Sequence, residues 1–161
     1  MNRPGFGTAA RWPGGEAWDC AGGRIGDDEP GSVGRMSSVV GIVLDCRHAA
    51  RLARFWEVAL GWQVRPYDEA EIARLAARGL TPETDPMVAV DAPGGSPVFF
   101  LQEVPEPKTA KNRMHLDIRL RDRTHLSELL ALGATVLSEQ ENWLVLADPE
   151  GNEFCASTLS R

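Results

Sequence analysis

The side chains best suited to acid–base or metal chemistry lie in the second half of the chain. His115 has an unperturbed pKa of about 6.5, so its ring can bind a metal in the neutral form or transfer a proton near neutral pH. Glu153 and Cys155 are two residues apart in a segment with strand character, and strand alternation places them on one face. His115 and Glu153 are therefore the candidate catalytic residues.

Each of these residues also has a structural interpretation. His115 could be a hydrogen-bonded histidine of the core, and Glu153 a solvated or turn-stabilising residue of a hairpin. Cys155 could be a small core residue, which is the usual role of a free cysteine. No Ser/His/Asp or CxxC arrangement stands out, and the glycines form no phosphate-binding signature between a strand and a helix.

Composition excludes several functional classes. The 161 residues include 17 Lys and Arg against 23 Asp and Glu, and this acidic balance argues against a nucleic-acid partner. No run of 18 apolar residues occurs, so we expect no membrane span. The three cysteines are odd in number and widely spaced, which indicates reduced thiols in a cytoplasmic protein.

Hydrophobic periodicity predicts the elements that position these side chains. Helices are expected where apolar residues recur on one face, over 48–60, 69–78 and 122–132. Strands are expected at 39–45, 62–65, 87–91, 98–103, 114–120, 135–139, 143–147 and 153–157. Glycines at 61, 79 and 133 end the three helices, as C′ residues commonly do.

The order of these elements repeats along the chain. The segment 59–64 (ALGWQV) aligns with 131–136 (ALGATV) at an offset of 72, and the same offset aligns 44–45 with 116–117. The chain is therefore predicted to be α+β, with two βαβββ modules at about 38–103 and 113–158. Their paired, curved, mixed sheets should enclose a cleft, which is the expected ligand site.

Segment 104–112 links the two modules. Lys108 and Lys111 lie in it, and Arg113 follows directly. These three cations could anchor the crossover or attract an anionic ligand, and we favour the first interpretation.

Residues 1–35 differ from the rest of the chain. They hold nine of the 16 glycines but only three of the strong core-forming residues Ile, Leu, Val and Phe. Such a segment cannot offset its ordering entropy. We expect a disordered or mis-annotated extension, with translation starting at Met36 and the folded domain spanning 36–161.

Several separated motifs resemble the vicinal oxygen chelate superfamily. They are the paired βαβββ modules, the helix ending at 55–62 (FWEVALGW), the linker and strand at 104–117 (VPEPKTAKNRMHLD) and the hairpin at 148–154 (DPEGNEF). This fold is shared by glyoxalase I, extradiol dioxygenases and bleomycin- and fosfomycin-resistance proteins. The linker is most similar to the glyoxalase-like domain subgroup. The resemblance implies the fold firmly and the function weakly, because one fold hosts many activities.

The resemblance also implies where a metal would bind. Metal-dependent relatives hold one divalent ion, such as Zn, Ni, Fe or Mn, with ligands from the first and last strands of both modules. The matching residues here are His115, Gln102 and either Cys155 or Glu153. The expected first-strand ligand is missing, because Gly41 and Val43 occupy its positions. A divalent metal and no cofactor at all are thus equally compatible with the sequence.

Two functional hypotheses follow. In the first, the protein is a glyoxalase-type lyase or isomerase that uses His115 and a degenerate metal site to handle a proton beside a carbonyl. In the second, it is a metal-independent, drug-sequestering binder like the bleomycin-resistance proteins. Aromatic side chains would then line the ligand cleft, namely Trp56, Trp62, Phe100 and Trp143. Both hypotheses imply a small-molecule partner, and we expect a homodimer because proteins of this fold commonly pair.

Overall fold

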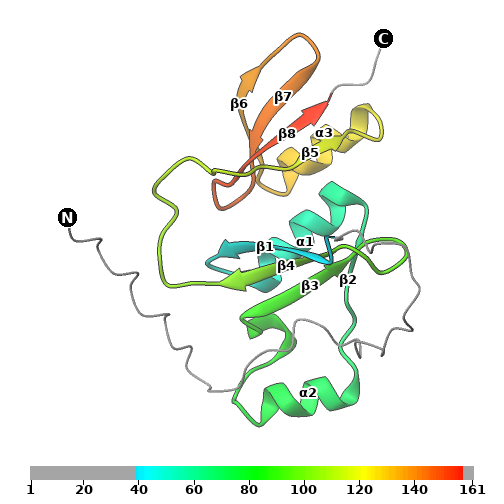
Figure 1. Ribbon diagram of the computed structural model, residues 1–161, viewed down its shortest axis with the longest axis vertical. Helices are drawn as coiled ribbons and strands as arrows, with labels where there is room; N and C mark the ends of the chain where they lie inside the picture. The colour runs from blue at the N-terminus through cyan, green and yellow to red at the C-terminus, as the bar shows by residue number, and fades with distance from the viewer. Residues whose placement is uncertain (1–38, 158–161) are drawn as a thin grey trace, which may run out of the picture. The chain divides into compact units, whose positions relative to one another are not determined.

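The computed structural model describes residues 39–157 as an α+β domain built from two modules of like order (Figure 1). The first module holds β1 (Gly41–Cys46), α1 (Ala49–Leu60), β2 (Gln63–Val64), β3 (Met87–Asp91) and β4 (Val98–Glu103). The second holds β5 (Asp117–Arg119), α3 (Arg123–Ala131), β6 (Thr135–Glu139), β7 (Trp143–Ala147) and β8 (Glu153–Ser157). The predicted fold class is confirmed. The predictions for residues 1–35 lie outside the described residues.

The two sheets have equivalent topology. The strand order is β1-β4-β3-β2 in one sheet and β5-β8-β7-β6 in the other. In each sheet the first and last strands pair in parallel and the remaining pairs are antiparallel. This shared order agrees with the repeat predicted from the 72-residue offset.

The first module carries an insertion between β2 and β3 that the second module lacks. It contains α2 (Glu69–Ala76) and a short 3₁₀ turn, η1 (Pro82–Thr84). Asp68 begins α2 with a capping box, in which its side chain accepts from the Glu71 N–H and the Glu71 side chain accepts from the Asp68 N–H. Leu75 is the one residue of α2 that is fully buried, so this helix is held mainly by its own capping and by one apolar contact.

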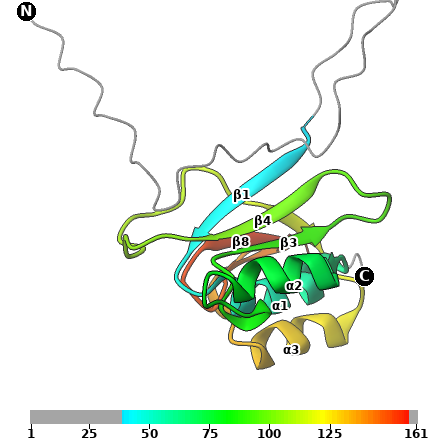
Figure 2. The ribbon, with the colours of Figure 1, turned by 90° about the horizontal axis from the view of Figure 1, so that it is seen from below.

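The core lies between the inner faces of the sheets and the helices α1 and α3. Alternate residues of β3, β4, β7 and β8 are buried, as expected for sheets with one covered face. Helix α1 packs against β3 and β4 and also contacts α3 (Figure 2). Its aromatic residues Phe55 and Trp56 meet Phe154 of β8, with ring centroids 5.9 and 5.2 Å apart. A helix of the first module therefore shares its core with a strand of the second.

Candidate functional site

Three potential metal ligands come together at the start of the second module. Donor atoms of His115, Asp117 and Cys155 all lie within 4.8 Å of one another. The parallel pairing of β5 with β8 sets Asp117 directly opposite Cys155. His115 lies two residues before Asp117, ahead of the strand as the structure defines it. We refer to these three residues as the HDC cluster.

The hydrogen bond within the HDC cluster determines how the imidazole is presented. Nδ1 of His115 lies 3.0 Å from Oδ1 of Asp117. A carboxylate accepts hydrogen bonds, so in a neutral ring the proton lies on Nδ1 and Nε2 is the basic nitrogen. Both side chains reach solvent, with 41% of the His115 side chain and 75% of the Asp117 side chain exposed. The imidazole can thus act as a base, and a metal ion within the cluster would displace the Nδ1 proton.

The third member of the HDC cluster is a protonated thiol in the absence of a cation. Burial raises the pKa of Cys155, and the charge and hydrogen bond of Asp117 raise it further. A neutral imidazole, a carboxylate and a thiolate are nevertheless a donor set that suits Zn²⁺. Three protein ligands leave the fourth position of a tetrahedral ion open, as in catalytic zinc sites. The residues present therefore fit a divalent metal of this type.

Gln102, the predicted ligand from the first module, lies in the other sheet. It is on β4, in register with Asp45 of β1 and Met87 of β3. Its role as a ligand stays a prediction.

The structure leaves little room for a side chain at position 41, one of the two positions expected for the first-strand ligand. A Cβ atom at Gly41 would lie 3.2 Å from Cε2 of Phe100 and 3.3 Å from the carbonyl oxygen of Val98. Contacts this short would force the neighbouring groups to move. The Phe100 ring therefore occupies the space that a side chain at position 41 would need.

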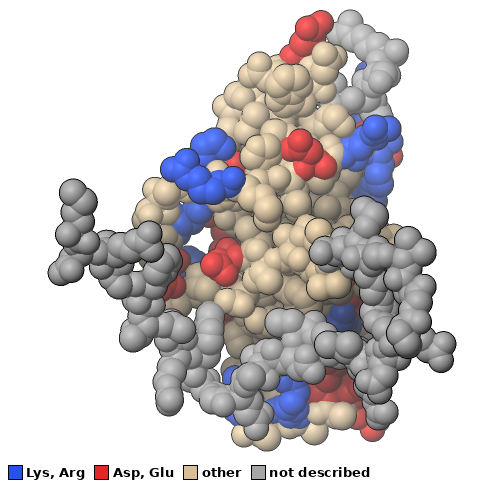
Figure 3. All heavy atoms as spheres, viewed as in Figure 1, with Lys and Arg blue, Asp and Glu red and all other residues tan. Residues whose placement is uncertain are grey.

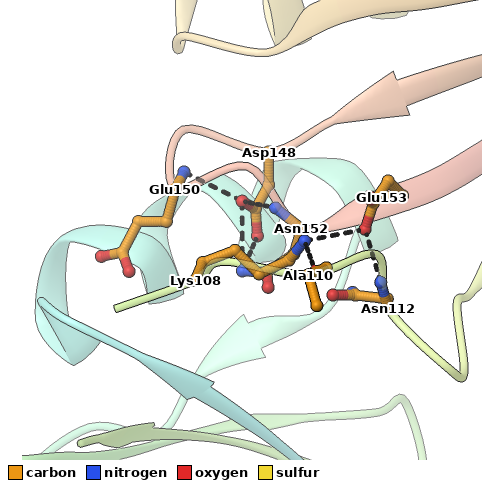
Figure 4. A network of polar contacts seen from close by, with 7 residues as sticks. All are labelled: Lys108, Ala110, Asn112, Asp148, Glu150, Asn152 and Glu153. Carbon is orange, nitrogen blue, oxygen red and sulfur yellow. Dashed lines mark hydrogen bonds and ion pairs between the residues drawn. The ribbon is translucent and has the colours of Figure 1, made fainter. Parts of the chain in front are cut away.

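Glu153 is tied to the linker between the modules (Figure 4). Its Oε2 atom accepts from the Asn112 N–H at 3.0 Å and from the Lys108 ammonium at 3.1 Å. These donors hold the pKa of Glu153 at about 2, well below its ordinary value. The contacts support an anchoring role for Lys108 and Glu153, and they engage the Glu153 oxygen that would otherwise act as a base or ligand.

The turn at 148–152 joins the second module to helix α1. Asp148 is buried and accepts from the Trp56 indole N–H at 3.2 Å, and also from the backbone and side chain of Asn152. The Glu150 carboxylate accepts from the backbone N–H groups of Arg47 and His48 at 2.6 and 3.0 Å. We refer to the 148–152 turn and these contacts as the intermodule clasp; Figure 4 shows Asp148, Glu150 and Asn152 of the turn.

The predicted aromatic cleft residues lie in different environments. Trp56 is 2% exposed and belongs to the core, so its ring offers no free face to a ligand. Trp62 and Phe100 are half-buried. Trp143, at the start of β7, is 46% exposed. Trp56 therefore does not have the predicted role, and the roles of the other three residues stay predictions.

A cavity of about 710 Å³ lies where the modules meet. Its wall is built from the end of β1, the start of α1, the linker and the turn of the intermodule clasp. The residues of the HDC cluster are not among those that line it, although Asn112 and Met114, close before His115, are. The cavity and the HDC cluster are therefore separate features of the described domain.

Sequence reasoning missed Asp117 as a site residue and missed the role of Asp148 and Glu150. The signal for Asp117 was present, because strand alternation places residues 115 and 117 on one face, as it does 153 and 155. No local pattern pointed to Glu150, whose partners are about 100 residues away in the chain.

Comparisons with known proteins agree with this architecture. The family model described as a glyoxalase-like domain matches residues 41–157. The fosfomycin resistance protein FosX from Listeria monocytogenes is 10% identical, with 78% of this chain and 94% of that chain covered at a TM-score of 0.53. A glyoxalase-related enzyme from Fulvimarina pelagi is 17% identical, with 77% and 89% covered at a TM-score of 0.52.

A third similar structure is a glyoxalase/bleomycin resistance protein/dioxygenase family enzyme from Burkholderia phytofirmans PsJN. It is 16% identical, with 77% of this chain and all of that chain covered at a TM-score of 0.51. At these identities the likeness concerns the fold alone. A search of curated protein sequences finds no match to this chain. Among the described residues, no helix is both long and apolar enough to cross a membrane.

Proposed function

The chain belongs to the glyoxalase-like domain family, and we propose that it binds one divalent metal ion, preferably Zn²⁺, at the HDC cluster and uses it to hold a small molecule through its oxygen atoms. The observation that carries this proposal is the convergence of His115, Asp117 and Cys155 within 4.8 Å. A zinc ion with one open position would polarise a carbonyl oxygen of the bound molecule as a Lewis acid.

The protein side chains have separate tasks at this site. Asp117 accepts the Nδ1–H of His115, so an ion bound at the HDC cluster would replace this proton and would be held by Nδ1, an Asp117 oxygen and the Cys155 sulfur. Cys155 gives up its proton on binding and supplies the thiolate. A thiolate and a carboxylate together balance the two charges of Zn²⁺, which compensates for the missing first-strand ligand.

Metal substitution with Co²⁺ tests the proposal, because a thiolate bound to Co²⁺ absorbs in the near ultraviolet. We expect the full chain, purified without chelator or nickel column, to bind one equivalent and to show this band. Cys155→Ser should abolish the band, and His115→Ala should lower the affinity at least about 100-fold. Cys46→Ala is the matched control, since Cys46 is buried in the core and should leave the band intact. The absence of the band in the wild type, or its persistence in Cys155→Ser, would refute the proposal.

One observation favours metal-independent binding as a second candidate function. The cavity of about 710 Å³ is large enough for a drug-sized molecule, yet none of the HDC residues lines it. In this alternative the protein sequesters a small molecule at the junction of its modules. Ligand binding that is unchanged in Cys155→Ser and His115→Ala would favour this function over the metal-dependent one.

A further inference from the structure

Three arginines in the wall of the intermodule cavity have no carboxylate partner among the described residues. They are Arg47 and Arg51 at the start of α1 and Arg113 at the end of the linker. Ion pairs of the described domain instead involve Arg65, Lys108, His115 and Arg121. The three guanidinium groups are therefore available to a molecule that enters the cavity.

The position of Arg51 is unfavourable for the helix itself. The N-terminus of a helix carries partial positive charge, so a cation in the first turn is destabilising. Helix α2 follows the usual rule, with Glu69 and Glu71 in its first turn, whereas α1 has Arg51 and no acidic residue there. Local rules of this kind are commonly broken where a site requires it.

The backbone N–H groups of residues 47–49, where the chain enters α1, are already engaged. Glu150 already accepts from the N–H groups of Arg47 and His48, and Glu103 accepts from that of Ala49 at 3.0 Å. The arginine side chains are thus the free donors on the wall. Arginine is well suited to this role, because its planar fork binds carboxylate and phosphoryl oxygens through two parallel hydrogen bonds.

The other residues of the wall indicate the charge and the apolar content that a ligand should have. Of its other charged groups, Lys108 is held by Glu153, and Glu150 is held by the backbone N–H groups of Arg47 and His48. Asp45 and Glu106 remain, so three free cations face two free anions. The wall also has an apolar part, formed by Val43, Leu44, Leu52, Val104, Pro107, Met114 and Pro149.

We propose that the intermodule cavity is a binding site for a small organic anion, with an apolar body and one oxyanion group held by Arg47, Arg51 and Arg113. The shared chemistry of its ligands is a carboxylate or phosphoryl group. On the face seen in Figure 3, Lys and Arg side chains gather in a few groups, with Asp and Glu side chains between and beside them. The site does not depend on a metal at the HDC cluster, because no HDC residue lines the cavity.

Three probes with the same naphthalene body test this site on the full chain. They are 2-naphthoate, 2-naphthyl phosphate and neutral 2-naphthol, titrated by calorimetry at pH 7 in low salt. We expect at least one of the two anions to bind about tenfold or more tightly than the neutral probe, since a hydrogen bond to a charged group is worth about that factor. Comparison of the two anions shows whether carboxylate or phosphoryl is preferred.

The double variant Arg47→Gln/Arg51→Gln should remove this advantage of the anion while leaving 2-naphthol binding unchanged. Arg113→Gln alone should remove part of it and serves as a second variant if the double variant does not fold. Arg78→Gln, at an exposed position outside the cavity wall, is the matched control and should bind like the wild type. Equal affinity for the anions and 2-naphthol, or the same loss in Arg78→Gln, would overturn the proposal. Binding that persists in Cys155→Ser would separate this site from the HDC cluster.

Discussion

Replacement of Asp148 by Asn tests whether the intermodule clasp stabilises the domain. Oδ1 of Asp148 accepts from the N–H groups of Glu150 and Asn152, both at 2.9 Å, while Oδ2 accepts from Trp56 at 3.2 Å and from the Asn152 amide at 3.0 Å. An asparagine can keep the first pair. Its amide nitrogen would then face the N–H donors of Trp56 and Asn152, so the two hydrogen bonds that Oδ2 accepts are lost and these buried donors have no acceptor.

The expected loss follows from these contacts. Two hydrogen bonds to a charged acceptor are worth about 1.5–3 kcal/mol each. Removal of the charge offsets part of this loss. Burial raises the pKa of Asp148, which indicates that the buried carboxylate charge itself destabilises the folded protein. We therefore expect the free energy of unfolding to fall by about 2–4 kcal/mol. For a domain of this size that lowers the melting temperature by roughly 8–16 °C.

Thermal and urea unfolding at pH 7, followed by circular dichroism, measure this loss. The control is Asp45→Asn, the same substitution at an exposed position with no hydrogen bond given for its side chain, which should change stability by less than about 0.5 kcal/mol. Because the pKa of Asp148 is raised on folding, its ionisation costs stability as the pH rises through that pKa, and Asp148→Asn should lose this dependence. A variant as stable as the wild type, or an equal loss in the control, would refute the reasoning.

Three other predictions concern acid stability, packing and assembly. The pKa of Glu153 is about 2 in the folded protein, so the stability that its carboxylate provides is lost as the pH falls from about 4.5 towards 2. Acid unfolding of Glu153→Gln should not show this loss of stability over that pH range, whereas acid unfolding of the control Glu106→Gln should still show it. Gly41→Ala should lower the free energy of unfolding in urea by about 1–3 kcal/mol, and this loss should be smaller when Phe100→Ala is also present. If the losses of the two single variants simply add in the double variant, the predicted contact between position 41 and Phe100 is contradicted. Light scattering should show a homodimer, since Leu137 and Trp143 are exposed, and a monomer at micromolar concentration would contradict this.

The fold could be predicted from the sequence because its signals are local and repeated. Apolar periodicity located the three helices and the eight strands, and the 72-residue offset paired the two modules. The insertion helix was also predicted, with its start one residue after the cap at Asp68. The strand containing His115 was predicted too long, because β5 covers only Asp117–Arg119 before the chain turns into α3.

The candidate site was predictable only where its residues share a module. His115 and Cys155 were identified from family positions, and the pairing of β5 with β8 brings them together. The contacts of Glu153, Glu150 and Trp56 could not be inferred, because each partner lies at least 41 residues away in the chain. Such distant contacts depend on how the modules dock, and a hydrophobic pattern carries no information about docking.

The intermodule clasp has a consequence for how the domain folds. In solenoid repeat proteins, stability is approximately a sum of terms for the repeats and for their interfaces. Here the second module supplies the Glu150 carboxylate to the N–H groups of Arg47 and His48, just before α1, and the Asp148 carboxylate to the buried indole of Trp56. The first module would therefore lose these partners if it were separated from the second. The two copies are interdependent, and unfolding should be a single cooperative transition despite the repetitive origin of the chain.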